Sequence, residues 1–406
     1  MPSVLFLSPG YPGEMPHFVR GLAEVGAEVF GLGDQPAALL PESVRRALSG
    51  YLRVRSLWDE AAVAAAAREW LGARTPDRVE CLWEPGMLLA ARLREALGVP
   101  GLSVEKTLPF RNKELMKQAL DRAGIRTPRH AAARGGDQIR AAAERIGYPL
   151  IVKPIAGAGS ADTHRVEEAA GLEEAIRSTA HVEEVSVEEF IDGEEYTFDT
   201  VSIAGEPAYW NVAWYRPRPL VARSEEWISP QVVALRHPGQ PQLAAGVEMG
   251  RRVLAALGFE SGFTHMEWYR KSDGEVVFGE IGGRPPGAHQ VDQMNYACDI
   301  DVFRGWADAV AFGRFRENVR RLYNVANVYK RARGSGIIRR IDGLDAFRRR
   351  HAEAIVWENL LPVGSARRNW KQTLVSDGFV VVRHPELDVT LALADELGSD
   401  VHLYAA

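Results

Sequence analysis

Apolar runs and helical patterns alternate through the first part of the chain. Residues 4–7 are a compact apolar run that ends at the Ser-Pro-Gly of residues 8–10, which is typical of a buried parallel strand followed by a tight turn. Residues 17–25 carry apolar side chains at helical spacing, and residues 27–32 form a second apolar run. A strand, a helix and a strand in this order predict a βαβ unit.

The same alternation recurs more weakly up to about residue 106. Its pattern predicts a helix over residues 61–71, a strand over residues 79–83 and a helix over residues 87–97. We therefore expect residues 1–106 to form a small doubly wound domain, which places the chain in the α/β class.

Residues 107–315 are expected to form a larger domain of mixed α and β content. A long stretch over residues 210–238 carries Trp, Pro and Arg without a clear period and predicts a loop or lid with short strands. The regular elements predicted here are helices over residues 112–124, 137–147, 168–179, 241–257 and 299–312, and strands over residues 148–154, 185–191 and 196–203.

Short runs with frequent turn residues dominate the last part of the chain. Turn signals stand at Gly334, Gly343, Gly364 and the Asp-Gly pair of residues 377–378. The pattern predicts that residues 316–406 form a small, β-rich C-terminal unit.

A β-hairpin is the clearest local prediction. Residues 263–269 and 276–281 both alternate, and Asp273-Gly274 between them is a strong signal for a two-residue turn. A turn at these two residues would pair positions whose numbers sum to 547, so that Glu267 lies opposite Glu280.

Two acidic side chains directly opposite each other on a hairpin need a reason. Cross-strand neighbours have Cβ atoms ~4.5–5.5 Å apart, and two like charges there are destabilising unless one is protonated or a cation lies between them. Oxygen ligands suit a hard ion, so Glu267 and Glu280 are candidate ligands of Mg²⁺ or Mn²⁺. His265 lies on the same face as Glu267, and Arg284 follows Glu280 closely enough to return toward it. The alternatives are that both glutamates are solvated or that the register slips by one residue.

Candidate phosphate-binding groups precede the hairpin. The Ala-Gly-Ala-Gly-Ser of residues 156–160 follows an apolar strand directly and offers backbone N–H groups without hindrance, although it is not a Walker A loop. Lys153 stands at the end of that strand, where it can neutralise phosphate. Lys113 is placed in the first turn of a helix, where a positive charge opposes the helix dipole unless it binds an anion. A plain connecting loop and a solvated lysine are the alternatives.

A second strand offers groups for a nucleoside. Residues 185–191 form a strand whose backbone could read the edge of an adenine, and the carboxylate of Glu195 in the following turn could accept both ribose hydroxyls. Acidic residues in a turn are also common simply because they are solvated.

Composition and charge exclude several classes of protein. The chain has 406 residues, of which 46% are hydrophobic and 25% charged, so disorder, collagen and coiled coil are excluded as its main architecture. A formal net charge of −5 provides no basic field for nucleic acid or acidic lipid. Arginine-rich stretches over residues 314–321 and 331–350 are interleaved with acidic residues and indicate solvated faces.

The cysteines and the N-terminal residues suggest a compartment. The two cysteines, Cys81 and Cys298, lie far apart without metal-type spacing, so we expect a reducing cytoplasm rather than a disulfide or zinc scaffold. The first residues lack a basic region and a long apolar run, so no signal peptide is expected. No run approaches the ~20 apolar residues of a membrane helix, so no membrane partner is expected.

Together, these motifs in this order resemble the ATP-grasp superfamily, and within it the carboxylate–amine ligases that join amino acids, such as L-amino acid ligases. The resemblance covers residues 107–315 in motifs and the whole chain in domain order. The matching stretches are Asn112-Lys113-x-x-Met116, Leu150-Ile-Val-Lys153-Pro154, Gly157-Ala-Gly159-Ser160, Glu188-Glu-Phe-Ile-Asp-Gly193-x-Glu195, Thr264-His-Met-Glu267 and Phe278-Gly-Glu280-x-x-x-Arg284-Pro-x-Gly287.

The resemblance implies a role for each candidate residue. The catalytic residues would be Arg284, Lys153 and His265. Arg284 would contact the substrate carboxylate or its acyl phosphate. His265 would either orient the substrate or a phosphate, or only support a metal ligand from behind. ATP would be bound by the phosphate-facing Lys113 and Lys153, by the loop residues Gly157, Gly159 and Ser160, by the adenine-facing backbone of Glu188, Glu189, Phe190 and Ile191, and by Glu195 at the ribose. Glu267 and Glu280 would hold Mg²⁺ or Mn²⁺.

The resemblance implies an ATP-dependent ligase that forms an amide or peptide bond through an acyl phosphate. Its substrates would be a small-molecule carboxylate and an amine, both amino-acid-like, with no nucleic-acid partner. Many members have Asn two residues after the second metal glutamate, whereas this chain has Gly282, so the number of metal ions is open. Whether the chain forms a homodimer is open as well.

Other functions compete with this one. A carboxylase of the same superfamily would make carboxyphosphate from bicarbonate, and a non-catalytic homologue would bind ATP without turnover. A nicotinamide dehydrogenase is disfavoured because neither glycine cluster completes the dinucleotide fingerprint: Pro36 and Asp162 stand where the third glycine belongs.

Overall fold

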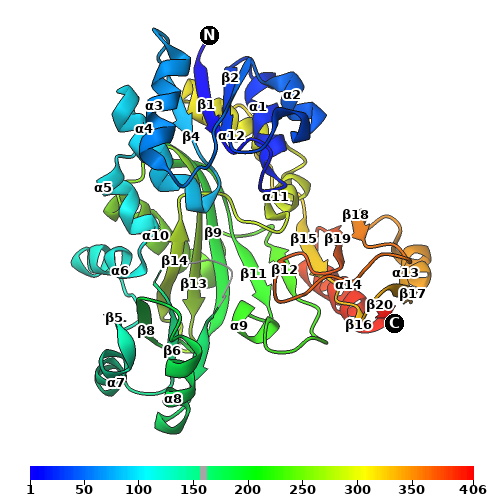
Figure 1. The fold of residues 1–406 in the computed structure, drawn as a ribbon. Helices are drawn as coiled ribbons and strands as arrows, with labels where there is room; N and C mark the ends of the chain where they lie inside the picture. Colours follow the sequence, from blue (N-terminus) through cyan, green and yellow to red (C-terminus); the bar gives the residue numbers. More distant parts are fainter. Residues whose placement is uncertain (156–161) are drawn as a thin grey trace.

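The computed structural model describes residues 1–155 and 162–406. Within these residues the chain forms four β-sheets, and helices cover the larger ones (Figure 1). The N-terminal sheet is parallel, whereas antiparallel pairs build the two sheets that follow it in the chain. This combination of parallel and antiparallel sheets agrees with the predicted α/β class, in which residues 107–315 were expected to mix helices and strands as in an α+β domain.

The N-terminal sheet has the strand order β3-β2-β1-β4, and all three pairings are parallel. The apolar run over residues 4–7 is fully inside, as predicted, because parallel strands are covered on both faces. The prediction missed β3 and α2. The elements are β1 (Ser3–Leu7), α1 (Met15–Glu24), β2 (Glu28–Gly33), α2 (Glu42–Ala47), β3 (Gly50–Arg53), α3 (Glu60–Leu71), β4 (Arg78–Glu80) and α4 (Met87–Leu97).

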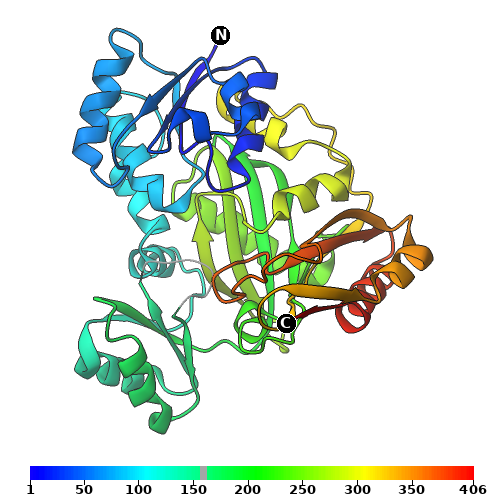
Figure 2. The same cartoon turned by 45° about the vertical axis from the view of Figure 1, so that its right-hand side comes forward.

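A small antiparallel sheet of order β5-β8-β6-β7 stands apart at the lower left of Figure 2. Two helices pack their apolar faces against it and form a separate core. Ahead of it runs α6 (Lys113–Arg122), whose N-cap is Asn112 as predicted, since the Asn112 side chain accepts from the N–H groups of Glu114 and Leu115. The elements are β5 (His130–Ala133), α7 (Gly135–Ile146), β6 (Leu150–Pro154), β7 (His164–Val166), α8 (Ala169–Ser178) and β8 (Val185–Glu189).

A nine-stranded sheet forms the centre of the molecule, with the order β14-β13-β9-β11-β12-β15-β19-β18 and with β10 also paired to β9. Residues 210–238 contribute β11 and β12 to the middle of this sheet, and the part between these two strands contains only the short helix α9. The elements are β9 (Glu194–Ile203), β10 (Glu206–Asn211), β11 (Ala213–Arg216), α9 (Pro219–Ala222), β12 (Gln231–Ala234), α10 (Pro241–Ala256), β13 (Gly262–Arg270) and β14 (Val276–Gly282).

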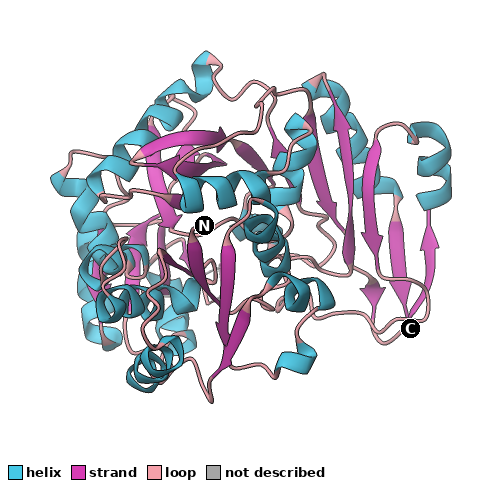
Figure 3. Cartoon of the chain, turned by 90° about the horizontal axis from the view of Figure 1, so that it is seen from above, coloured by secondary structure: helices cyan, strands magenta, loops and turns pink. Residues whose placement is uncertain are grey.

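The C-terminal residues divide between two sheets. Strands β15, β18 and β19 extend the central sheet, while β16, β17 and β20 form a separate three-stranded sheet at one side of the molecule (Figure 3). Two helices accompany these strands, so this part is less purely β than expected. The division at residues 106 and 315 stays a prediction. The elements are β15 (Asn324–Tyr329), β16 (Arg333–Gly334), β17 (Ile338–Asp342), α13 (Leu344–His351), β18 (Ile355–Leu360), β19 (Gly378–His384), α14 (Leu387–Asp400) and β20 (His402–Ala405).

Two helices join the N-terminal region to the central sheet. The sequence predicted one helix over residues 299–312, whereas the structure has α11 (Gln290–Cys298) and α12 (Val302–Phe312). The second helix begins at Val302 because Asp301 caps it. Phe18 of α1 packs edge-on against Phe303 of α12, with ring centroids 4.8 Å apart. Through α12, the N-terminal region packs against the central sheet, which carries the glutamate hairpin.

Candidate active site

A cleft of about 650 Å³ opens between the small sheet, the central sheet and the N-terminal region. Every described residue that the sequence nominated lines it: Lys113, Lys153, Glu188, Glu189, Phe190, Ile191, Glu195, His265, Glu267, Glu280 and Arg284. Gly157, Gly159 and Ser160 lie outside the described residues.

The hairpin turn differs from the prediction. Arg270 pairs with Val276, and the N–H of Lys271 donates to the carbonyl of Glu275 at 2.9 Å, so the loop has three residues rather than two. Gly274 has φ +89° in this loop, a left-handed conformation that glycine adopts at low cost. Near the turn the paired positions therefore sum to 546, one less than expected.

A β-bulge restores the predicted pairing. The register shifts between Glu267 and Trp268, and from there Glu267 lies opposite Glu280. Gly279 is the extra residue, and a Cβ there would come within 2.8 Å of the carbonyl oxygen of Glu267. The juxtaposition of the two glutamates is confirmed, although two departures from the expected hairpin cancel to produce it.

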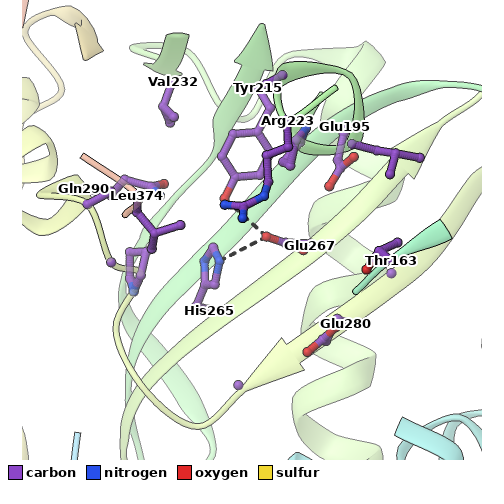
Figure 4. Close-up of a pocket in the computed structure, with 18 of the residues that line it drawn as sticks. Thr163, Glu195, Tyr215, Arg223, Val232, His265, Glu267, Glu280, Gln290 and Leu374 are labelled. Carbon is purple, nitrogen blue, oxygen red and sulfur yellow. Dashed lines mark hydrogen bonds and ion pairs between the residues drawn. The ribbon is translucent and has the colours of Figure 1, made fainter. Parts of the chain in front are cut away.

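Each of these glutamates has a cationic neighbour. The Lys113 ammonium at the start of α6 lies 3.1 Å from Oε1 of Glu280. Oε1 of Glu267 lies 3.4 Å from Nε2 of His265 and accepts from the Tyr215 hydroxyl at 3.3 Å (Figure 4). The two side chains remain partly open to the cleft, with exposed fractions of 28% for Glu280 and 29% for Glu267.

A buried aspartate that the sequence analysis missed holds His265. Nδ1 of His265 lies 2.6 Å from Oδ1 of Asp199, directly across β13 and β9. Burial alone would lower the pKa of His265, but the hydrogen bonds to Asp199 and Glu267 outweigh it and raise the pKa to about 9. The imidazolium is therefore a buried cation that orients Glu267. A carboxylate within the strand predicted over residues 196–203 was the available signal for Asp199.

A second carboxylate, Glu188, is enclosed by cations. Its oxygens lie 2.6 Å from the Lys117 ammonium and 3.0 Å from the Lys153 ammonium, and the Ser186 hydroxyl donates to it at 2.7 Å. Although burial opposes ionisation, the two lysines hold the pKa of Glu188 well below its usual range. Lys117, which the sequence analysis missed, is fully buried, and its position one turn after Lys113 was the available signal.

The adenine prediction needs correction at Glu188. Its backbone pairs with both β5 and β6 inside the small sheet, so it is not available to a base. The N–H groups of Glu189 and Phe190 also donate to protein carbonyls, those of Arg129 and Pro149. The backbone that could contact the edge of an adenine is therefore limited to Phe190 and Ile191, which follow the end of β8 at Glu189.

Glu195 is paired with an arginine from the segment after β11. Nε of Arg218 lies 3.4 Å from Oε2 of Glu195, and its Nη1 donates to the carbonyl of Ile191 at 2.7 Å. The guanidinium also lies 4.9 Å from the ring centroid of Phe190 and 4.8 Å from that of Tyr269. Burial and the nearby Glu267 raise the pKa of Glu195 to about 8. Arg218 is not among the site residues that the sequence predicted.

Arg284 returns to the same cleft, as expected, but its partner comes from the N-terminal region. Its Nε donates to Oε2 of Glu84 at 2.9 Å, and Arg111 pairs with the other oxygen of Glu84. Arg284 and Arg111 hold the pKa of Glu84 below its usual value although burial opposes this. A Cβ at Gly282 would lie 3.3 Å from Cγ of Arg284, so the glycine leaves room for this side chain.

The donor set fits a hard cation that is only partly held by protein. Glu267 and Glu280 face one cleft and supply oxygen ligands. In residues 1–155 and 162–406, no group of three His, Cys, Asp or Glu side chains converges as a closed metal site. A cation here would therefore need further oxygen ligands from a bound substrate or water. No helix in these residues is long and apolar enough to cross a membrane.

Residues 118–292 match the family model described as the ATP-grasp domain. This part of the chain is an ATP-grasp domain. It contains the hairpin, the small sheet and the cleft-facing residues from Lys153 to Arg284. The ATP-grasp domain thus carries all but one of the described site residues that the sequence nominated, the exception being Lys113.

The curated proteins to which this chain is similar include ligases. An L-arginine-specific L-amino acid ligase from Bacillus subtilis is 27% identical over 215 residues, 51% of each chain. An alanine–anticapsin ligase from Bacillus subtilis is 26% identical over 248 residues, 55% of this chain and 52% of the relative. A D-alanine–D-alanine ligase B from Xanthomonas campestris is 38% identical over 122 residues, 29% of this chain and 37% of the relative. The chain thus spans about half the length, or less, of the curated relatives it matches.

Solved structures share the fold over nearly the whole chain. The crystal structure of an L-amino acid ligase from Bacillus licheniformis superposes with a TM-score of 0.80 at 22% identity, covering 100% of this chain and 99% of that one. An N5-carboxyaminoimidazole ribonucleotide synthetase from Thermotoga maritima superposes with a TM-score of 0.71 at 15% identity and covers 100% of both chains. These likenesses concern the fold, which combines the ATP-grasp domain with regions before and after it.

Proposed function

We propose that this protein is an ATP-dependent carboxylate–amine ligase that joins amino-acid-like substrates through an acyl phosphate. The observation that carries the proposal is that Glu267 and Glu280 face one cleft together with Lys113 and Lys153. Two open carboxylates beside two lysines suit a magnesium nucleotide better than either group alone. The ligases among the relatives support amino acids as the class of substrate.

ATP would lie between the small sheet and the central sheet. Lys113 and Lys153 would contact its phosphates, the backbone near Phe190 and Ile191 its adenine, and Glu195 its ribose. Arg218 pairs with Glu195 in this structure. When ATP binds, Arg218 would either share the Glu195 carboxylate with the ribose or move away from it. Mg²⁺ or Mn²⁺, held by Glu267 and Glu280, would neutralise charge on the phosphate oxygens.

The first step would activate the acid. An oxygen of the substrate carboxylate attacks the γ-phosphorus, the bond from that phosphorus to the β,γ-bridging oxygen breaks, and ADP leaves with the electron pair. Lys153 and Lys113 neutralise charge that develops on the phosphates, and positioning supplies most of the remaining rate. Glu188 holds the Lys153 ammonium at 3.0 Å and so fixes it before the nucleotide arrives.

The second step would form the amide. The nitrogen of a neutral amine attacks the acyl carbon, the bond from carbon to the phosphate oxygen breaks, and the phosphate leaves with the electron pair. The nitrogen gives up one proton, which the departing phosphate takes. Arg284 can stabilise the tetrahedral oxyanion, because it lines the cleft and is held there by Glu84, which accepts from its Nε, and by the carbonyl of Pro285, which accepts from its Nη1. The cleft excludes bulk water in part, which protects the acyl phosphate.

The test is a screen of amino-acid pairs for ADP and phosphate release, with mass spectrometry of the products. We expect a dipeptide or related amide in equal amount to ADP, and loss of turnover in Glu280→Gln. Glu275→Gln is the matched control, since Glu275 lies on the same hairpin but pairs with Lys271 and Arg126 away from the cleft.

Three outcomes would contradict the proposal. Full turnover in Glu280→Gln would remove Glu280 from the metal site. ADP release that depends on bicarbonate and needs no amino acid would indicate a carboxylase. ATP binding without ADP release for any pair would indicate a non-catalytic homologue.

A further inference from the structure

In the part of the chain that the structure describes, two arginines at one end of the cleft form no ion pair. Arg223 follows α9, Arg331 follows β15, and both line the cleft. In the described part of the chain neither has a carboxylate oxygen within 4.0 Å. The other buried cations of the cleft differ in this respect, because Arg284 pairs with Glu84 and Lys153 pairs with Glu188.

Arg331 is held by neutral groups only. Arg331 is only 9% exposed, and its Nη1 donates to the carbonyls of Ala222 and Glu225, each at 2.8 Å. The guanidinium lies 4.4 Å from the ring centroid of Trp370. These contacts orient the group, but a carbonyl or an aromatic face does not cancel a full charge.

Arg223 adds a second charge to the same place. One of its nitrogens, Nη2, donates to the carbonyl of Lys371 at 2.6 Å. Burial and the nearby Arg223 together lower the pKa of Arg331 to about 10, although the Glu226 carboxylate opposes this. Two like charges that are partly desolvated and close to each other destabilise the structure unless an anion joins them.

The position of this arginine pair relates it to the hairpin. Figure 4 shows the Arg223 side chain directed into the cleft on the same side as Tyr215, whose hydroxyl donates to Glu267. Tyr329 lies two residues before Arg331 and also lines the cleft. The lysines expected to contact phosphate, Lys113 and Lys153, instead come from α6 and β6. The arginine pair therefore faces the space left for a substrate.

We propose that Arg223 and Arg331 bind an anionic oxygen group that the amine substrate keeps throughout the reaction. A guanidinium pair matches a carboxylate or a phosphate in geometry as well as in charge. The carboxylate of the acid substrate is consumed when it is activated, so a group bound permanently here belongs to the other substrate. An amino acid with a free α-carboxylate has this chemistry, and so has an amine that carries a phosphate monoester. This proposal rests on the ligase function.

Steady-state kinetics test the proposal directly. Three amine substrates are compared: an amino acid accepted in the screen, its neutral carboxamide, and an amine with a phosphate monoester in place of the carboxylate. We expect the wild type to prefer one of the anionic amines, and Arg223→Met and Arg331→Met to raise the KM for that amine by roughly 10–100-fold with kcat changed much less. The kinetics with the carboxamide should be unchanged.

The controls separate binding from folding. Arg331→Lys keeps the charge and should recover part of the lost affinity. Arg340→Met removes an arginine that pairs with Asp342 outside the cleft and should leave the KM values unchanged. Equal losses with the anionic amine and its carboxamide, or no change in KM for either variant, would overturn the proposal.

A binding measurement keeps this test independent of turnover. Sulfate is the probe, and its effect on the unfolding temperature is compared between the wild type and the Arg223→Met, Arg331→Met double variant. We expect a smaller sulfate-dependent rise in the double variant, and this result would stand even if no ligase activity were found. An identical rise in both proteins would exclude an anion site at these arginines.

Discussion

Two acidic sites in the same cleft contain similar groups but differ in how they are enclosed. At Glu188, two ammonium groups and a hydroxyl surround the carboxylate, and its side chain is only 5% exposed. At Glu267 and Glu280, each carboxylate has a cationic neighbour on one side and remains open to the cleft on the other. A closed carboxylate fixes its neighbours, whereas an open one can still accept a ligand.

Lys153 connects the two sites. Burial alone would lower its pKa, but Glu188 and then Glu280 and Glu267 outweigh burial and raise it. The ammonium is therefore charged and held in place by the closed site while the open site lies within electrostatic reach. We therefore expect Glu188 to contribute mainly to the free energy of unfolding, and Glu267 and Glu280 to contribute mainly to kcat. Substitutions can test these two expectations.

The largest effect is expected from Glu267→Gln. Losing one of the two open carboxylates should lower kcat by roughly 10³-fold, because the charge lost acts where phosphate charge develops. The free energy of unfolding should change little, since His265 keeps Asp199 as its partner. Initial rates of ADP release and urea unfolding measure the two quantities. Glu206→Gln, at the exposed first residue of β10, is the control. A large loss of stability with retained activity would reverse the assignment.

Glu188→Gln should have the opposite profile. It leaves Lys117 and Lys153 without their shared counter-charge, and breaking a buried ion pair costs about 3–5 kcal/mol in unfolding free energy. Urea denaturation measures this loss. Adding Lys117→Met to the variant should recover part of the stability, because one uncompensated charge then disappears. If Glu188→Gln unfolds at the wild-type midpoint, the closed site does not stabilise the fold.

Gly279→Ala tests the bulge that aligns the open site. The added Cβ would meet the carbonyl oxygen of Glu267 at 2.8 Å, so the two strands must shift. We expect a loss of about 1–3 kcal/mol in unfolding free energy, together with a lower kcat as Glu267 and Glu280 move apart. Gly239→Ala is the control, because a Cβ there meets nothing within 4 Å. Unchanged kcat would mean that the register is not required.

Asp199→Asn should change the pH dependence more than the rate at neutral pH. The pKa of His265 is about 9 with the Asp199 carboxyl group as its hydrogen-bond partner, and replacing that group by an amide should lower the pKa toward the ordinary value of ~6.5. Stability from the charged histidine is present below pH ~6.5 and lost as the pH rises through about 9, so the variant should lose it at lower pH. The alkaline limb of the kcat profile should move the same way, by about one to two pH units. An unmoved limb would show that His265 does not support Glu267.

Local patterns predicted the parts of the site that lie on one element. The alternation of β13 and β14 predicted that Glu267 would face Glu280, and Asn112 predicted the start of α6 that places Lys113. The same hairpin shows the limit of local reasoning. A three-residue loop replaced the expected turn, and only the bulge at Gly279 restored the register. Loop length and bulge depend on backbone contacts that alternation does not encode.

The partners that tune the site could not be predicted in this way. Glu84 is 200 residues from Arg284, and Asp199 is 66 residues from His265. Lys117 reads as an ordinary polar residue of α6 until the small sheet places Glu188 beside it at 2.6 Å. Each of these pairs forms only when separate elements pack against each other, so the local sequence pattern around either residue does not predict its partner.

The order of residues in the chain determined which elements form and which faces carry charge, because side-chain periodicity follows from helix and strand geometry alone. Only the tertiary structure decided which carboxylates are enclosed and which stay open, and which arginines form no ion pair within the described residues. Burial and the distance between charges set those properties, and both arise when the N-terminal region, the small sheet and the central sheet close around one cleft.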